Sequence, residues 1–209
     1  MPSEVDIYGG VDPSEVPLYT QKDVAHHLNL PPSTVGYWVR GRCPHPQPVI
    51  SPWTSEELSF LHLVELFTLK ALRDFHHASL PKIRQAIDDL EDHGIERPLL
   101  QGADIWCNIF PLKNGQEEVL CRVERDADSV PRKLFPVVED SINERPVVIN
   151  PQVSFGRPTA GETGIKTTFI ASRFRAEETV GEIAEDYRID PSLVVDALCY
   201  EKVTCNELA

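Results

Sequence analysis

The amino-acid sequence predicts an α+β protein that is mainly helical, with a helix-turn-helix at each end and a small central antiparallel β element. Three patterns predict this arrangement. Residues 19–42 contain two stretches of helical period separated by a Leu-Pro-Pro turn. Residues 103–124 alternate with period two around an Asn-Gly pair, and residues 179–200 again contain two short helical stretches. The helical ends and the alternating centre therefore define the expected fold class.

The first helix of the N-terminal pair is predicted to begin after Thr20. This residue is a suitable N-cap, and Asp23 stands three residues on, in the capping-box position. The apolar residues that follow at helical spacing are Val24, Ala25 and Leu28. Asn29 can end the helix, and Leu30-Pro31-Pro32 predicts the turn, because a proline disfavours helical geometry in the residue before it.

The second helix is predicted to open at Ser33 and Thr34, with an apolar side and a polar side. The apolar side consists of Val35, Trp38 and Val39. The other side carries polar and basic groups, namely Ser33, Thr34, Tyr37 and Arg40. Two short helices joined in this way are typical of a DNA-reading helix-turn-helix. The alternative is a helical hairpin whose only role is packing.

A proline-rich loop follows the second helix. Three prolines in the five residues 44–48 exclude a helix, so an extended loop, the wing of a winged helix-turn-helix, is expected here. Its candidate phosphate contacts are Arg42, His45 and Gln47. A plain linker is an equal alternative for His45 and Gln47.

Two further helices are predicted after the loop. Thr54 and Glu57 form a capping-box pattern, and an apolar stripe runs from Leu58 to Phe75. Ser79 is expected to cap the next helix, which has Gly94 at its exit and Ile83, Ala86, Ile87 and Leu90 inside. Both stripes are expected to form core, and any excess apolar surface on the longer helix would serve dimerisation.

The N-terminal region resembles the MerR-like winged helix-turn-helix. The matching residues are Tyr19-Thr20, Ala25, Ser33-Thr34 and Tyr37-Trp38. The resemblance implies binding of double-stranded DNA, with Thr20 joining the contacts on the second helix, and dimerisation. One residue departs from the pattern, since Gly36 stands where the family often has an arginine that faces DNA.

The middle of the chain is predicted to form short strands. Ile105, Cys107 and Ile109 alternate with bulky residues, and Asn114-Gly115 is a strong hairpin signal before a returning strand at 119–123. Further short strands are expected at Leu134–Val138 and at Pro146–Ile149.

The C-terminal region resembles the domain-of-unknown-function family numbered four-three-three. The resemblance is carried by Ile149-Asn150-Pro151, Phe155-Gly156-Arg157-Pro158, Gly161–Thr167, Ser172-Arg173-Phe174 and Glu182–Tyr187. It implies a short β arm followed by a compact helix-turn-helix. Thr179 and Asp190 are the expected caps of the two helices, with Pro191 at the tolerated first position. The second of these helices carries acids and no base before Lys202, so it is expected to pack rather than read DNA.

These patterns divide the chain into an acidic N-terminal segment (1–18), a MerR-like DNA-binding domain (19–100), a β-hairpin with its connector (101–145) and a C-terminal domain (146–209). A chain that joins these two regions resembles a VapB-type antitoxin of a type II toxin-antitoxin system. That resemblance implies a PIN-domain ribonuclease toxin as partner and repression of the protein's own promoter. It also implies that arginine contacts the toxin, for which Arg157, Arg173 and Arg175 are the candidates. Local hydrogen bonds are an equal alternative for Arg157 and Arg173.

Composition narrows the class of protein. The net charge is −13, while residues 19–42 carry three basic residues and one acid, a local charge of +2. A weakly basic reading head on an acidic body favours a homodimer on DNA and a more basic protein partner. No apolar run is long enough to span a membrane, and the acidic N-terminus lacks a signal core, so a cytoplasmic protein is expected.

No catalytic or metal-binding pattern stands out. The five cysteines contain no CxxC pair, and neither a Gly-rich phosphate loop nor an HExxH or GxSxG motif occurs. The sequence therefore predicts a protein that is not an enzyme and that has no metal, cofactor or catalytic residue. Two alternatives to the antitoxin stay open: a MerR-like transcription regulator without a toxin partner, and a dimeric interaction module.

Overall fold

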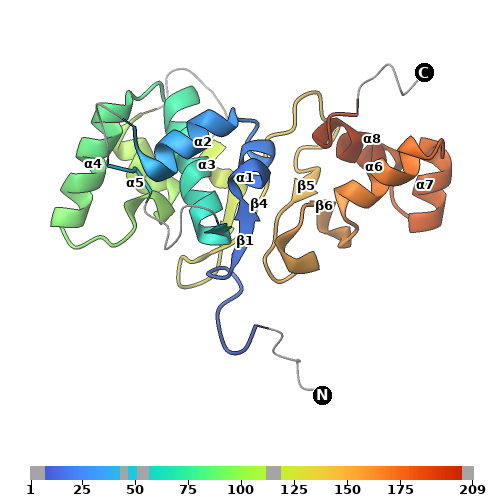
Figure 1. The fold of residues 1–209 in the computed structure, drawn as a ribbon, viewed down its shortest axis with the longest axis horizontal. Coiled ribbons are helices and arrows are strands. Elements are labelled where there is room, and N and C mark those ends of the chain that lie inside the picture. Colours follow the sequence, from blue (N-terminus) through green and yellow to red (C-terminus); the bar gives the residue numbers. More distant parts are fainter. Residues whose placement is uncertain (1–7, 43–46, 51–56, 112–118, 204–209) are drawn as a thin grey trace. The chain divides into compact units, whose positions relative to one another are not determined.

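The computed structural model describes residues 8–42, 47–50, 57–111 and 119–203. Its internal contacts divide the chain into two units, residues 1–132 and 133–209. Both are mixed α+β in character, with helices and two-stranded sheets (Figure 1). Among the described residues, none of the helices is both long and apolar enough to cross a lipid bilayer.

The described part of unit 1 contains five α-helices and short strands. Its helices are α1 (Gln21–His27), α2 (Pro32–Arg40), α3 (Phe60–Asp74), α4 (Leu80–Asp92) and α5 (Ala103–Ile109). Its strands are β1 (Pro17–Thr20), β2 (Glu57–Ser59) and β3 (Val123–Arg125). Two 3-10 turns, η1 (Pro98–Leu100) and η2 (Val119–Arg122), complete it.

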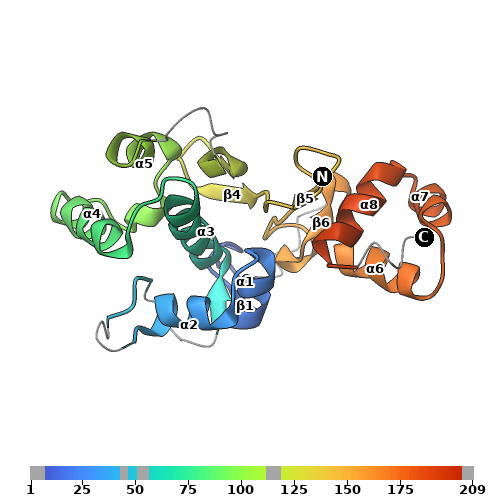
Figure 2. The same ribbon diagram turned by 90° about the horizontal axis from the view of Figure 1, so that it is seen from above.

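Helix α3 is the centre of the unit 1 core. Eleven of its fifteen residues are buried, and the helix contacts α4, η1, β1 and β2 (Figure 2). Because its apolar side chains are already covered within one chain, α3 has no surplus apolar stripe. A dimer interface on this helix, as expected from the sequence, stays a prediction.

The start of α3 also differs from the expectation. Glu57–Ser59 is a strand rather than the first helical turn, because it pairs antiparallel with β1, with Tyr19 opposite Leu58. Ser59 is the N-cap, and its capping box uses His62, whose Nδ1 accepts a hydrogen bond from the Ser59 N–H (3.1 Å). Thr54, the predicted cap, lies outside the described residues.

The segment predicted as a β-hairpin is largely helical. Residues 103–109 form α5, in which Trp106 is fully buried and donates from Nε1 to the carbonyl of Pro98 (3.1 Å). The Trp106 ring also stacks on Phe110, with 6.2 Å between centroids. Burying this indole on one side of a helix outweighs the local period-two pattern. The Asn114-Gly115 turn lies outside the described residues, and Val119–Arg122 is a 3-10 turn rather than a strand.

Unit 2 is a three-helix cluster beside a small sheet. Its helices are α6 (Thr167–Arg175), α7 (Val180–Tyr187) and α8 (Pro191–Tyr200). Strands β5 (Val147–Val148) and β6 (Thr159–Ala160) pair antiparallel, and β4 (Pro131–Leu134) contains the boundary between the units. Two 3-10 turns are η3 (Ser154–Gly156) and η4 (Gly161–Thr163). Of the strand predicted at 134–138 only Leu134 is extended in a strand, where it bridges Ile149.

The helices of unit 2 follow their predicted caps. Thr179 forms a capping box with Glu182 at the start of α7, and Asp190 accepts from the Ser192 N–H (2.8 Å) at the start of α8. Helix α8 packs against both α6 and α7, and the core includes Ile170, Ile183, Val194 and Leu198. Helix α6 was not predicted, so this region is a bundle of three helices rather than an isolated pair.

Candidate functional site

The helix pair α1–α2 is positioned by the capping box at its start. The Thr20 hydroxyl accepts from the Asp23 N–H (3.2 Å), and the Asp23 carboxylate accepts from the Thr20 N–H (2.8 Å). Asn29 follows α1 in a left-handed conformation, with φ of 48°. Helix α2 then begins at Pro32, one residue before the predicted start. The predicted helix, turn and helix are all present.

Helix α2 carries most of the predicted DNA contacts on its outer side. Its inner side is buried and consists of Val35, Gly36, Trp38 and Val39. On the outer side Ser33 and Arg40 are exposed, and Thr34 and Tyr37 are half-buried. Thr20 and Arg42 are exposed at the start of α1 and just beyond α2. The structure therefore brings four of the six predicted residues together on one helix, Ser33, Thr34, Tyr37 and Arg40.

The absence of a side chain at Gly36 leaves room for the Arg40 guanidinium on this helix. A Cβ atom at position 36 would stand 2.5 Å from Arg40 Nη2 and 3.4 Å from Gln21 Oε1. The Arg40 guanidinium therefore occupies the space that a side chain at position 36 would need. An arginine at Gly36, as the MerR-like pattern often has, would displace it.

The end of the loop after α2 is hydrogen-bonded to helices α2 and α4. The N–H groups of Val49 and Ile50 both donate to the carbonyl of Trp38 on α2 (2.8 and 3.2 Å). Arg84 of α4 donates to the carbonyls of Gln47 and Pro48. Among the predicted wing contacts, Arg42 and Gln47 are exposed, while His45 lies outside the described residues. These hydrogen bonds tie the end of the loop to both α2 and α4.

Arg173, a candidate toxin contact, is held by groups within unit 2. Its guanidinium bonds Glu178 through Nε (2.9 Å) and Nη2, and Asp186 through Nη1 (2.6 Å). It also lies over the Tyr187 ring, 4.9 Å from its centroid. These partners raise the pKa of Arg173, with the Glu178 hydrogen bonds first, and Arg173 in turn lowers the pKa of Glu178. Of the two readings left open, this geometry supports local hydrogen bonding.

The other two candidate arginines lie apart from this network. Arg175 is exposed on the last turn of α6. Arg157 is exposed on the loop after η3, where its backbone N–H donates to the carbonyl of Ser154 (3.2 Å). The structure thus places Arg173 and Arg175 on one helix and Arg157 on the arm.

Exposed apolar side chains near the arm were missed in the sequence. Phe155 is 57% exposed, Phe169 55% and Val153 36%. Other apolar side chains of unit 2 are buried in its core. The exposure of these three large apolar side chains is therefore unusual. The available signal was Phe155 itself, an aromatic residue between turn-forming residues.

Unit 1 contains a cavity of about 380 Å³ near the start of α3. Its wall combines apolar side chains with His62, Glu65 and Arg97. Glu65 is buried and receives two hydrogen bonds from Arg97, at 3.1 and 2.9 Å. Burial raises the pKa of Glu65 against the opposing effect of Arg97. Burial, with a contribution from Arg97, lowers the pKa of His62 to about 4, so its ring is neutral near pH 7.

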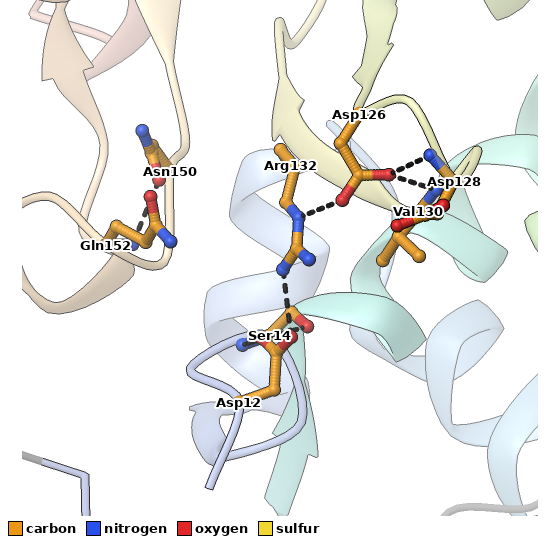
Figure 3. Close-up of polar contacts among 8 residues, drawn as sticks. All are labelled: Asp12, Ser14, Asp126, Asp128, Val130, Arg132, Asn150 and Gln152. Atoms are coloured by element: carbon orange, nitrogen blue, oxygen red, sulfur yellow. Dashed lines mark hydrogen bonds and ion pairs between the residues drawn. The ribbon is translucent and has the colours of Figure 1, made fainter. Parts of the chain in front are cut away.

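A polar cluster fastens the N-terminal segment to the rest of unit 1 (Figure 3). Arg132 donates from Nη1 to Asp12 (2.9 Å) and from Nε to Asp126 (2.7 Å). Asp126 also accepts from the N–H groups of Asp128 and Val130, and Asp12 accepts from that of Ser14. The hydrogen bond from Arg132 is the main cause that lowers the pKa of Asp126. With every carboxylate matched by donors, this cluster is structural.

Comparisons with known proteins agree with two of the sequence resemblances. Residues 147–200 match a family described as "Protein of unknown function (DUF433)". A Mycobacterium tuberculosis (strain ATCC 25618 / H37Rv) protein named "Putative antitoxin VapB45" is 24% identical over 227 aligned residues, which cover 88% of this chain and 93% of the relative. The crystal structure of Rv2018 from Mycobacterium tuberculosis superposes with a TM-score of 0.69 at 22% identity, covering 88% of this chain and 98% of that one.

The structural comparison and the sequence comparisons support different conclusions. The structural likeness establishes a shared fold over most of the chain. The family match and the antitoxin relative together support an antitoxin-like family for this protein.

Proposed function

We propose that this protein is the antitoxin of a type II toxin-antitoxin system. It binds and neutralises a PIN-domain ribonuclease toxin and, as a cytoplasmic autorepressor, binds its own promoter DNA; it is not itself an enzyme. The observation that carries the proposal is the similarity to a protein named as an antitoxin, which extends over 88% of this chain and 93% of that relative. Similarity over nearly the whole of both chains favours a shared role more than a match to one domain does.

DNA binding is assigned to the MerR-like head formed by α1 and α2. The outer side of α2 offers hydroxyls at Ser33 and Thr34 and a guanidinium at Arg40, while Arg42 follows just beyond. Hydroxyl and guanidinium groups on the second helix suit contacts to base edges and phosphates in a major groove. The local charge of +2 is small against −13 for the chain, so two heads in a homodimer would be needed for firm binding.

The dimer is expected to form outside α3, whose apolar residues are covered within one chain. We therefore place the interface on the C-terminal helices. A homodimer also matches the two-fold symmetry of most operators. Light scattering at micromolar concentration tests this, and a monomer would overturn the dimer proposal.

The DNA-binding proposal is tested with promoter DNA and arginine variants. Arg40→Ala and Arg42→Ala should each weaken binding, and each should reduce the salt slope by about one unit, because each removes one phosphate contact. Arg73→Ala is the matched control, since Arg73 is exposed on the last turn of α3 and carries the same charge. An Arg40→Ala/Arg42→Ala double variant that binds promoter DNA as tightly as the Arg73→Ala control would refute the assignment.

Toxin binding is tested by expression of the full chain with the product of the neighbouring gene. Co-purification of the two, with loss of ribonuclease activity in the complex, is the expected result. If the neighbouring product is no PIN-domain protein, or if it does not bind, the antitoxin proposal fails.

A ligand-responsive MerR-like regulator is the second candidate, and the unit 1 cavity favours it. Val49 and Ile50 line the cavity and donate their N–H groups to Trp38 of α2. A ligand in the cavity could therefore move the proposed reading helix. Promoter binding that responds to a small molecule, in a protein that binds no toxin, would select this candidate. A pure dimeric interaction module would bind neither DNA nor toxin.

A further inference from the structure

The loop around η3 carries an exposed aromatic side chain on an unfavourable backbone. Ser154, Phe155 and Gly156 are consecutive left-handed residues, with φ of 52°, 57° and 67°. Glycine adopts this region readily, whereas a bulky residue such as phenylalanine rarely does. Phe155 is nevertheless 57% exposed, so it gains little burial in return. A strained, exposed aromatic residue points to a role outside the folding of its own chain.

The surrounding contacts hold this loop in place. Ser154 Oγ donates to the carbonyl of Gly164 (3.0 Å), and the Gly156 N–H donates to that of Val153 (3.0 Å). Asn150 Oδ1 accepts from the Gln152 N–H (2.9 Å), as Figure 3 shows. The conformation that presents Phe155 is therefore fixed before any partner binds, which reduces the entropy lost on binding.

The second exposed aromatic residue follows a segment that contacts this loop. Val153 lies against Gly164, where an added Cβ would be 3.8 Å from Val153 Cγ1. Two residues further on, Lys166 places its ammonium 5.4 Å from the centre of the Phe169 ring. Phe169 is 55% exposed on the first turn of α6. We use the name arm surface for Val153, Phe155, Arg157, Lys166 and Phe169.

The charge of this region indicates what it would bind. The segments that carry it hold Arg157, Glu162 and Lys166, and Glu162 is paired with Lys133 (2.6 Å). Three positive charges against one negative give +2 in a chain of −13. Exposed aromatic rings beside cations suit an apolar pocket with an acidic rim. A polyanionic nucleic acid fits less well, because a charge of +2 supplies few phosphate contacts.

We propose that the arm surface is the docking site for the toxin and that Phe155 is its main anchor. This inference rests on the proposed antitoxin function and moves the contact from the arginines to an aromatic side chain. Phe155 enters an apolar pocket on the toxin, Phe169 packs at its edge, and Arg157 and Lys166 face acidic groups on its rim. Arg173 takes no direct part, because its guanidinium is engaged by Glu178 and Asp186.

Replacement of Phe155 by glycine separates binding from folding. Phe155→Gly removes the anchor and relieves the left-handed strain, so its Tm should equal or exceed that of the wild type while toxin binding weakens. The loss should be on the order of 30-fold in Kd, as for an interface hot spot. Phe169→Ala should weaken binding less. The probe is the purified neighbouring gene product, titrated with the full-length chain by calorimetry.

Ile142→Ala is the matched control, because Ile142 is 65% exposed in the same unit and belongs to another segment. The control should bind toxin like the wild type. Toxin binding by Phe155→Gly within twofold of the wild type would overturn the inference and leave the antitoxin function standing. A wild-type chain that binds no toxin would instead overturn the proposed function. Loss of DNA or RNA binding by Phe155→Gly, with toxin binding retained, would reassign the arm surface to nucleic acid.

Discussion

Among the described residues, each unit buries one carboxylate, and the two are stabilised in different ways. In unit 1, Glu65 faces a guanidinium and receives both hydrogen bonds from Arg97. In unit 2, Asp196 is fully buried and its bonded partners carry no charge. They are the N–H groups of Ile142 and Asn143, at 2.6 and 2.9 Å, and the Asn143 amide, at 2.7 Å.

The difference lies in what each carboxylate holds together. Glu65 and Arg97 are 32 residues apart and join α3 to the segment before η1. Asp196 instead fixes a loop without regular structure to α8, across more than 50 residues of sequence. The Glu65–Arg97 pair joins two side chains, whereas the hydrogen bonds from two consecutive backbone N–H groups to Asp196 require one loop conformation. Unit 2 should therefore be the more sensitive of the two to loss of its buried acid.

The largest expected effect is that of Asp196→Ala. The change leaves donors at Ile142 and Asn143 without their acceptor, which should lower the free energy of unfolding by about 3 kcal/mol. Chemical denaturation followed by circular dichroism measures it. Glu185→Ala, an exposed acid in the same unit, is the control and should stay within about 0.5 kcal/mol of the wild type. A loss of under about 1 kcal/mol for Asp196→Ala would remove the contrast between the units.

Arg97→Ala should follow, with a loss of between about 2 and 3 kcal/mol at pH 8, because the buried Glu65 charge loses its partner. Burial already raises the pKa of Glu65 above its ordinary value of 4.5, and loss of Arg97 removes the opposing effect. A raised folded-state pKa means that stability falls as pH rises through it. The deficit should therefore be smaller at pH 5 than at pH 8. A deficit that is equal at both would show that Glu65 is not the titrating group.

The pH dependence of unit 1 should also contain a contribution from His62. Its pKa is lowered from 6.5 to about 4, so the unfolded chain binds the proton first as pH falls. The stabilisation is full above pH 6.5 and is lost progressively towards pH 4. Allowing for partial exposure, it amounts to about 2 kcal/mol. His62→Gln keeps a capping-box acceptor without titrating, so its stability should decline less over this range than that of the wild type. Parallel declines would contradict the assignment.

The smallest expected effect is that of Gly36→Ala, beside the Arg40 guanidinium on α2. Gly36→Ala should stabilise α2 by about 0.5 kcal/mol, since glycine is unfavourable inside a helix. The new Cβ requires only the mobile tip of Arg40 to move. Thermal denaturation measures the gain. Because the charge is kept, the salt slope of any DNA binding should not change; a changed slope would mean that the position of Arg40 matters as well as its charge.

Local signals predicted the helix starts best. The capping box at Thr20 and the helix starts at Thr179 and Asp190 form as predicted, because each depends on residues within three positions. Helix α4 likewise follows Ser79, although the serine side chain makes no capping hydrogen bond. These features need no information from distant parts of the chain.

Predictions failed where distant contacts decide the structure. Thr54 and Ser59 both precede apolar stripes, and only the pairing of Glu57–Ser59 with β1 selects Ser59 as the cap. Residues 103–109 are short enough to suit a strand or a helix, and burial of Trp106 against Pro98 favours the helix. Neither partner can be identified from the local sequence.

The candidate sites divide in the same way. The outer side of α2 follows from helical spacing, so Ser33, Thr34 and Arg40 could be placed from the sequence. The environment of Arg173 depends on Glu178 and Asp186, which a loop and a second helix bring to it. The exposure of Phe155 depends on left-handed backbone angles that sequence alone does not specify.

The distribution of tryptophan gives the two units separate spectroscopic signals. The three tryptophans of the sequence are Trp38, Trp53 and Trp106, and all belong to unit 1. The sequence of unit 2 contains tyrosine but no tryptophan. Trp38 and Trp106 are buried, so their emission should shift to longer wavelength when unit 1 unfolds. Helical ellipticity comes from both units. In a variant weakened only in unit 2, ellipticity should therefore decrease at a denaturant concentration that leaves the fluorescence spectrum unchanged.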